Sequence, residues 1–212
     1  MNEEKNRKIG ILGGTFDPVH TAHLMIADHA ASDLALDQVF LMPTGISPHK
    51  DEESITPAAH RVNMIELATA DNPHLALSTF ELDDPETSYT YRTAERLSKA
   101  YPGTEFTYIM GADSLIHFRH WVHPEIISQH FHLSVAVRDD TDNEVLHTLA
   151  GEYEKLFGAR ITVLSVPNFS ISSTDIRDRV KKGMSIRYLT PDPVIDYIKA
   201  NNLYRTNSEE RI

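Results

Sequence analysis

Short apolar runs and helical patterns alternate along most of this 212-residue chain, and that alternation constrains its fold more than any other feature. Alternation of this kind is typical of βαβ units, whose strands run parallel in one sheet. The sequence therefore predicts an α/β fold built on a doubly wound parallel sheet of about six strands. We expect strands at residues 8–12, 39–42, 75–77, 106–110, 133–137 and 161–166, and helices at 21–36, 57–70, 89–100 and 142–157.

The pattern changes after residue 168, where we expect two further helices near 173–182 and 191–201. Thr190 and Pro191 are residue types preferred at an N-cap and at the first helical position. A chain of this length folds as one domain, or as one domain with a small appendage. We expect a single domain over 7–204, with an α/β core at 7–168, a C-terminal helical segment at 169–204, a flexible 1–6 and a disordered tail at 205–212.

Composition narrows the range of functions. The formal net charge of −11 argues against a general nucleic-acid-binding protein, because such proteins carry a basic surface. The chain has no cysteine, so it has no disulfide and no cysteine-based metal site, which fits a cytoplasmic protein. No apolar run approaches the ~18–20 residues of a membrane helix, and the polar start lacks a signal peptide's apolar core. We expect a cytoplasmic protein without membrane association; a homo-oligomer stays open.

The first predicted strand leads into a segment suited to binding an anion. Gly13 and Gly14 allow close backbone approach, Asp17-Pro18 predicts a turn, and His20 and His23 stand where the next helical pattern begins. A helix start offers unpaired N–H groups and a positive dipole end, and imidazoles there can donate hydrogen bonds to phosphate oxygens. The alternative is a pair of surface histidines that cap a turn. The setting favours a phosphate site.

A second helix start near the other end of the chain has the same potential. Ser172 with Asp175 three residues later resembles a capping box, and Arg177 follows in the first turn. Such clusters usually do no more than start a helix. A capped helix start with a nearby arginine is, however, also an anion site.

These two segments resemble the two signatures of the nucleotidylyltransferase superfamily, in its order and at about its spacing. The first match is Gly13-Gly14-Thr15-Phe16-Asp17-Pro18-Val19-His20 with His23, and the second is Ile171-Ser172-Ser173-Thr174-Asp175-Ile176-Arg177. Within the superfamily the chain is most similar to the bacterial nicotinate-nucleotide adenylyltransferases, over residues 7–204. Further matching segments are Pro48-His49-Lys50, Ser88-Tyr89-Thr90-Tyr91, Gly111-Ala112-Asp113-Ser114 and Trp121.

The resemblance implies a Rossmann-like fold and transfer of the adenylyl group of ATP to nicotinate mononucleotide, giving deamido-NAD and pyrophosphate in NAD biosynthesis. It makes His20 and His23 stabilise charge on the reacting phosphorus and the leaving pyrophosphate, while Arg177 clamps the β- and γ-phosphates. Mg²⁺ would enter with ATP, held by phosphates and water more than by carboxylates. The ATP-binding residues that it implies are Gly13, Gly14, Thr15, Phe16, Asp17, His20, His23, Gly111, Asp113, Arg138, Ile171, Ser172, Ser173, Thr174 and Arg177.

The same resemblance implies a pocket for the mononucleotide. Lys50 would reach its phosphate, Trp121 would stack on the pyridine ring, and Ser88, Tyr89 and Thr90 would line the pocket. From the residues alone, Lys50 could equally be a solvated loop lysine and Trp121 could fill the core.

Three positions depart from the family pattern. Ala22 stands where the family has glycine between the histidines; alanine would be strained there if φ were positive and tolerated if only close approach is needed. Asp139-Asp140 follow Arg138 in place of an Arg-Pro-Gly type of turn. Val122 follows Trp121 where some relatives have tyrosine, so recognition of the nicotinate carboxylate would rely more on backbone groups.

Two other functions stay open. A related transferase acting on nicotinamide mononucleotide, phosphopantetheine, FMN or a sugar phosphate would share these signatures, and a non-catalytic nucleotide-sensing module would bind ATP without turnover.

His117, His120 and His123 could gather on one helical face as metal ligands, since their spacing is i, i+3, i+6. We expect surface histidines and no protein-held metal, because Pro124 should end any helix nearby.

Overall fold

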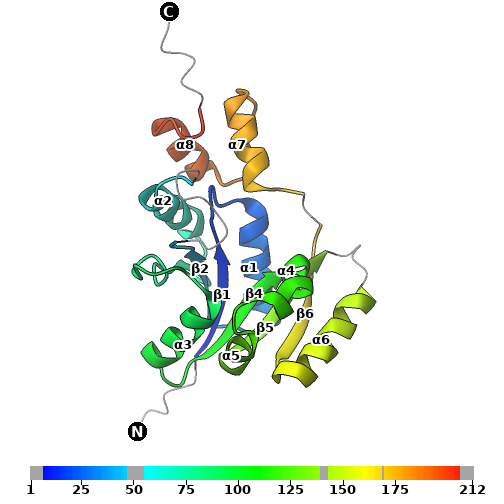
Figure 1. Ribbon diagram of the computed structural model, residues 1–212. Helices are drawn as coiled ribbons and strands as arrows, with labels where there is room; N and C mark the ends of the chain where they lie inside the picture. Colours follow the sequence, from blue (N-terminus) through cyan, green and yellow to red (C-terminus); the bar gives the residue numbers. More distant parts are fainter. Residues whose placement is uncertain (1–6, 47–54, 139–142, 169, 206–212) are drawn as a thin grey trace, which may run out of the picture.

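The computed structural model describes residues 7–46, 55–138, 143–168 and 170–205, arranged as Figure 1 shows. The predictions for the segment 1–6, for the tail beyond Arg205 and for Lys50 lie outside these residues. The side chain of Arg138 also lies outside the description.

A six-stranded parallel sheet forms the centre of the fold, and it confirms the predicted α/β class. The strand order is β3-β2-β1-β4-β5-β6, so the order reverses between β1 and β4. At that point Leu12 of β1 pairs with Leu41 on one side and Ile109 on the other. The strands are β1 (Lys8–Gly14), β2 (Gln38–Pro43), β3 (Leu75–Leu77), β4 (Glu105–Gly111), β5 (Phe131–Arg138) and β6 (Arg160–Val166).

The predicted helices are present with small shifts at their ends. Pro191 is the N-cap of the last helix and Asp192 its first residue, one position later than predicted, because the Thr190 hydroxyl donates to the Val19 carbonyl instead of capping. The helices are α1 (Thr21–Asp33), α2 (Ala58–Thr69), α3 (Thr90–Ala100), α6 (Asn143–Phe157), α7 (Ser173–Lys181) and α8 (Asp192–Ala200).

Two short helices between β4 and β5 were not predicted. They are α4 (Ala112–His117) and α5 (Pro124–His130), separated by a 3₁₀ turn at Phe118–His120. Helix α4 and the 3₁₀ turn end before Pro124, as expected, but the proline also begins a helix: it is buried at the first position of α5, where its missing N–H costs no hydrogen bond. His117, His120 and His123 therefore belong to three different segments and are exposed, so they share no helix face.

The sheet separates two apolar cores. Ile9 and Ile11 of β1 pack into one core with residues of α3, α4, α5 and α6, whereas Leu12 packs into the other with residues of α1, α2, α7 and α8. This is the alternation that a strand buried on both faces requires. Figure 1 shows α7 and α8 beyond the carboxyl end of β1, so the C-terminal helices stand over this edge of the sheet.

Replacement by alanine should change the free energy of unfolding in opposite directions at two glycines, Gly10 and Gly151. A Cβ added at Gly10 in β1 would lie 2.8 Å from both Leu36 and Val39, whereas one added at Gly151 in α6 would meet no atom within 4 Å. We expect Gly10→Ala to lower the free energy of unfolding by about 1–3 kcal/mol through overpacking. Gly151→Ala should raise it by about 0.5–1 kcal/mol, because alanine is the better helix former. Urea unfolding of both variants measures the two changes in the free energy of unfolding. Equal changes in the two variants would contradict the prediction.

Candidate active site

The two signature segments meet at the carboxyl edge of the sheet, where its strand order reverses. A cleft of about 810 Å³ opens there. Ligands of doubly wound sheets bind at such an edge. The predicted residues that line the cleft are His20 and His23 at the start of α1, Gly111 at the end of β4 and Asp113 just after it, and Ile171, Ser172 and Ser173 at the start of α7.

His20 and His23 form a pair at the start of α1. His20 is the N-cap, with extended backbone at φ −146°, and its N–H donates to Nδ1 of His23 over 3.2 Å. The rings stack with centroids 3.5 Å apart and planes inclined by 18°. Because Nδ1 of His23 accepts a hydrogen bond, the proton of its neutral ring is assigned to Nε2. The pair thus presents at least one defined N–H donor.

Burial keeps this pair uncharged. Desolvation lowers the pKa of His20 from 6.5 to about 4. It also lowers the pKa of His23 well below 6.5, and the neighbouring His20 lowers it further. Two stacked imidazolium rings would repel each other strongly in this low-dielectric setting. Both rings are therefore neutral hydrogen-bonding groups near neutral pH.

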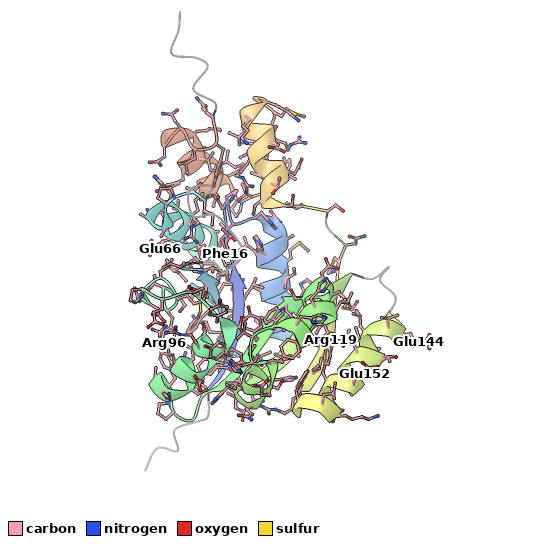
Figure 2. The ribbon with its side chains drawn as sticks, in the orientation of Figure 1. Phe16, Glu66, Arg96, Arg119, Glu144 and Glu152 are labelled. Atoms are coloured by element: carbon pink, nitrogen blue, oxygen red, sulfur yellow. The ribbon has the colours of Figure 1, made fainter. Side chains whose placement is uncertain are left out.

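The turn before α1 takes its shape from Phe16 and not from the glycines. Gly13 and Gly14 are the last residues of β1, whereas Phe16 has the left-handed φ of 50° and packs edge-on against His23 at 4.8 Å. Phe16 is labelled in Figure 2 near the end of β1. The glycines instead leave room: a Cβ on Gly13 would lie 3.0 Å from the hydroxyl of Tyr108, and one on Gly14 3.3 Å from the Phe16 ring.

Three consecutive carbonyls of this turn accept hydrogen bonds from the C-terminal segment. Nη1 of Arg177 donates to Asp17 O over 2.7 Å, the Ser173 hydroxyl donates to Pro18 O over 2.8 Å, and the Thr190 hydroxyl donates to Val19 O over 2.8 Å. Two of the predicted phosphate ligands thus also hold the turn that carries the histidines.

The start of α7 has the predicted capping geometry. Ser172 is the N-cap, and its hydroxyl accepts from the Asp175 N–H over 3.1 Å. Nη2 of Arg177 donates to the Thr174 hydroxyl over 3.2 Å. Of this segment Ile171, Ser172 and Ser173 line the cleft, while Thr174 and Arg177 are not among the described residues that line it.

Asp17 was predicted to bind ATP, but its carboxylate has partners within the protein. The buried carboxylate accepts a hydrogen bond from the Tyr204 hydroxyl over 2.6 Å and one from the Thr56 N–H over 3.2 Å. Thr15, its neighbour in the turn, offers its carbonyl to Nη1 of Arg61 over 3.1 Å.

Arg61 is a structural element of the site that the sequence analysis missed. Its buried guanidinium donates to Thr15 O, to Thr44 O over 3.0 Å and to Thr56 O over 3.1 Å, so it ties the first turn to both ends of the segment after β2. The one indication of this role in the sequence is the spacing of Arg61 from the apolar residues of the same helix. Arg61 lies at helical spacing on the same buried face of α2 as Met64, Ile65 and Ala68. A charged group on a buried face needs hydrogen-bond partners.

Two of the predicted mononucleotide residues, Thr90 and Trp121, contact Tyr108, a residue that the sequence analysis missed. The Tyr108 ring lies edge-on to Trp121 at 6.2 Å, and its hydroxyl interacts with Thr90 at the start of α3. Burial raises the pKa of Tyr108 to about 12, so the hydroxyl stays protonated. Ser88 is fixed by its N–H, which donates to Ile46 O over 2.9 Å, and Tyr89 is the N-cap of α3.

Ala22 is accommodated without strain. It lies in the first turn of α1 with helical backbone, and it is not among the non-glycine residues with positive φ. Its side chain forms part of the wall of the cleft. Backbone strain from a positive φ at Ala22 is therefore excluded, and the methyl group only takes a little space beside the histidines.

Within residues 7–46, 55–138, 143–168 and 170–205, no group of three or more histidine, cysteine or acidic side chains is placed to hold a metal ion. Across the same residues no helix combines the length and the apolar character needed to cross a membrane.

The comparisons with known proteins agree with this geometry. The model of the cytidylyltransferase-like family matches residues 11–179. Proteins from Lachnoclostridium phytofermentans and Enterococcus faecalis, both named "Probable nicotinate-nucleotide adenylyltransferase", are 38% identical to this chain. The matches cover 93% and 99% of this chain and 99% and 90% of those proteins. The chain belongs to the nicotinate-nucleotide adenylyltransferase family. The superfamily resemblance of the two signatures is thereby confirmed.

Solved structures share the fold of this family member. The Plasmodium falciparum nicotinic acid mononucleotide adenylyltransferase, in a complex with NaAD, aligns with a TM-score of 0.76 at 22% identity. The alignment covers 94% of this chain and 98% of that one. The same protein in a complex with APC aligns with a TM-score of 0.74. The Rossmann-like architecture expected from the sequence is therefore that of known relatives.

The lowered pKa of His20 makes stability depend on pH. The unfolded chain protonates this imidazole below pH 6.5 and the folded chain only near pH 4, so acidification through that window favours the unfolded state. Replacing His20 by Asn should remove up to about 3 kcal/mol of this acid destabilisation. Urea unfolding at about pH 7 and about pH 4.5 measures it. The exposed His117→Asn is the control; an equal change in both variants would refute the assignment.

Proposed function

We propose that this protein transfers the adenylyl group of ATP to nicotinate mononucleotide, giving deamido-NAD and pyrophosphate in NAD biosynthesis. The observation that carries the proposal is the cleft in which the neutral pair His20 and His23 faces the capped start of α7. The names of the relatives, together with the NaAD complex of the structural neighbour, support these substrates.

The reaction needs positioning and charge stabilisation more than proton transfer. A 5′-phosphate oxygen of the mononucleotide attacks the α-phosphorus of ATP in line, a new P–O bond forms, and the bond to pyrophosphate breaks. The attacking phosphate is already an anion near neutral pH, so no general base is required. His23, with its proton on Nε2, would donate to the phosphate oxygens, and fixed donors of this kind stabilise charge as it develops.

Arg177 can bind phosphate without giving up its contacts to the turn. A guanidinium carries five N–H donors, and two nitrogens of Arg177 already donate to Asp17 O and to the Thr174 hydroxyl. Its remaining donors would meet the β- and γ-phosphates, while Ser172 and Ser173 present the N–H groups of α7 to the cleft. The same arginine would then both hold the turn and clamp the leaving group.

Tyr108 gives the two substrate sites a common wall. Its hydroxyl lies beside Gly13 of the ATP turn, and its ring contacts Trp121 of the expected pyridine pocket. Ser88, Tyr89 and Thr90 would line that pocket, Trp121 would stack on the ring, and Lys50 would reach the phosphate of the mononucleotide. Gly111, Asp113 and Arg138 would complete the ATP side, since each comes at the end of β4 or β5 or just after it.

Mg²⁺ fits this site as a companion of ATP. The polar side chains among the described residues that line the cleft are the imidazoles of His20 and His23, the hydroxyls of Ser114, Ser172 and Ser173, and Asp113 as the one acidic group, while the other lining side chains are apolar. Such a donor set favours an anion, so the cation would be held by phosphate oxygens and water, as Mg²⁺ prefers. Bound in this way it would neutralise part of the charge of the pyrophosphate.

The histidine pair gives a direct test of the chemistry. His23→Ala should lower kcat for pyrophosphate release by at least ~10²-fold, because a donor to the reacting phosphates is lost. His29→Ala is the matched control, since His29 lies on the same helix, bonds to the Met25 carbonyl and is not among the described residues that line the cleft. Near-parent turnover of His23→Ala would rule out the role assigned to this residue.

An acceptor panel tests the substrate. Pyrophosphate release from ATP and Mg²⁺ should be fast with nicotinate mononucleotide and slower with nicotinamide mononucleotide, FMN and phosphopantetheine. Faster turnover with another acceptor would keep the adenylyl-transfer chemistry and overturn the assigned pocket. Binding of ATP without turnover on any acceptor would contradict the enzyme and favour the nucleotide-sensing module.

A further inference from the structure

Tyr204, close to the end of the described chain, reaches back to the turn that carries the histidines. Its hydroxyl donates to Oδ1 of Asp17 over 2.6 Å, across 187 positions of sequence. Short hydrogen bonds to a carboxylate are among the strong ones in proteins, and they fix direction as well as distance. The Tyr204 ring packs against the apolar core that contains α1 and α2. No predicted motif includes this residue.

The carboxylate that Tyr204 binds lies at the centre of the turn. Oδ2 of Asp17 accepts from the Thr56 N–H, and the Thr56 carbonyl in turn accepts from Arg61. The carbonyl of Asp17 accepts from Arg177. Asp17 therefore joins three separate parts of the chain, and the Tyr204 hydroxyl and the Thr56 N–H are the partners described for its carboxylate.

The orientation of Asp17 governs the histidines through a short stretch of backbone. Only Pro18 and Val19 separate it from His20, whose N–H sets the tautomer of His23. A rotation of the turn would weaken that hydrogen bond and leave Nδ1 of His23 free to take the proton. We propose that Tyr204 is a positioning residue that, through Asp17, holds His20 and His23 in the geometry used for adenylyl transfer. Only the expected effect of Tyr204 on kcat rests on the proposed function.

Tyr204→Phe removes the hydrogen bond to Asp17, together with the interaction of the hydroxyl with the Thr56 side chain, and leaves the other partners of the turn in place. The variant retains the ring in the core, and the hydrogen bonds from Arg177, Ser173 and Thr190 to the turn remain. A displacement of the reacting groups by about 1 Å can cost ~10² in rate, so we expect kcat to fall roughly 5- to 100-fold. The KM for nicotinate mononucleotide should stay within about twofold, because the pocket at Trp121 is not touched.

Tyr197 provides a matched control. It is a second tyrosine of the C-terminal segment, packs against the same core, and has a hydroxyl bonded to His60 and Asn63 of α2 over 2.9 and 3.1 Å. Tyr197→Phe removes an equivalent group that does not contact the turn. A melting temperature lowered similarly in both variants, with kcat lowered only in Tyr204→Phe, supports positioning. A similar kcat in the two variants overturns the proposal.

A double-mutant cycle shows whether Tyr204 acts through Asp17. In the presence of Asp17→Ala, adding Tyr204→Phe should change kcat by less than about twofold, because the hydroxyl has lost its acceptor. Additive losses in the cycle would mean that Tyr204 acts by another route and would overturn the proposal. Should Asp17→Ala fail to fold, the comparison of Tyr204→Phe with Tyr197→Phe still decides.

The imidazole of His23 gives a readout independent of turnover. The ¹⁵N shifts of its ring in the free protein should report the tautomer protonated at Nε2 in the parent and in Tyr197→Phe. In Tyr204→Phe they should shift towards a mixture of tautomers; an unchanged spectrum contradicts the proposal. If the parent protein turns over none of the acceptors, the proposed function fails, and this comparison still tests the positioning by Tyr204.

Discussion

The hydrogen bond from the His20 N–H to Nδ1 of His23 is the interaction on which the site depends. It requires an extended residue directly before the first turn of α1 and a partner three positions later, as in an N-terminal capping box. It uses the acceptor of His23 and so leaves Nε2 as the donor. Phe16 closes the other side of the ring, so His23 is held between an aromatic edge and a stacked imidazole.

The turn that makes this bond possible is stabilised from the far end of the chain. A tight turn exposes carbonyl groups that must find donors when buried, and the residues of the described C-terminal segment supply them through Arg177, Ser173 and Thr190. The N–H of Thr21 likewise donates to Leu189 O over 2.9 Å. The C-terminal helices are thus part of the frame of the first signature, and substitutions around α7 and α8 would be felt at the histidines.

Local rules predicted the six strands, six of the helices and the two histidines at a helix start, but not α4 and α5, and they carry no information on contacts between distant segments. Strand periodicity, the cap at Ser172 and the helix start at His20 depend on neighbours within a few residues. Pro124 was interpreted only as the end of a helix, whereas a proline can also stand at the first position of the helix that follows it, as it does in α5. Arg61 and Tyr204 are recognisable only once the turn around Asp17 is in place, because their partners are backbone and carboxylate oxygens far away in sequence. Tyr108 looked like any strand residue, although it stands between the two expected substrate sites.

The acidic balance of the chain is compatible with the proposed anionic substrate, because neutral donors and a helix start line the cleft and the proposed cationic groups, Arg177 and Lys50, act locally. Acidic residues such as Glu66, Glu144 and Glu152, labelled in Figure 2, lie on α2 and α6 at the outside of the fold, where salt screens them over about 8–10 Å. The cleft is lined by the two neutral imidazoles and by Ser172 and Ser173 at the start of α7, which would face the proposed ligand. Burying neutral donors costs less than burying imidazolium ions, and they need not reorganise when charge moves to the leaving group. In the proposed function, the desolvation that lowers the pKa of the pair is therefore also what would suit it to stabilise the transition state.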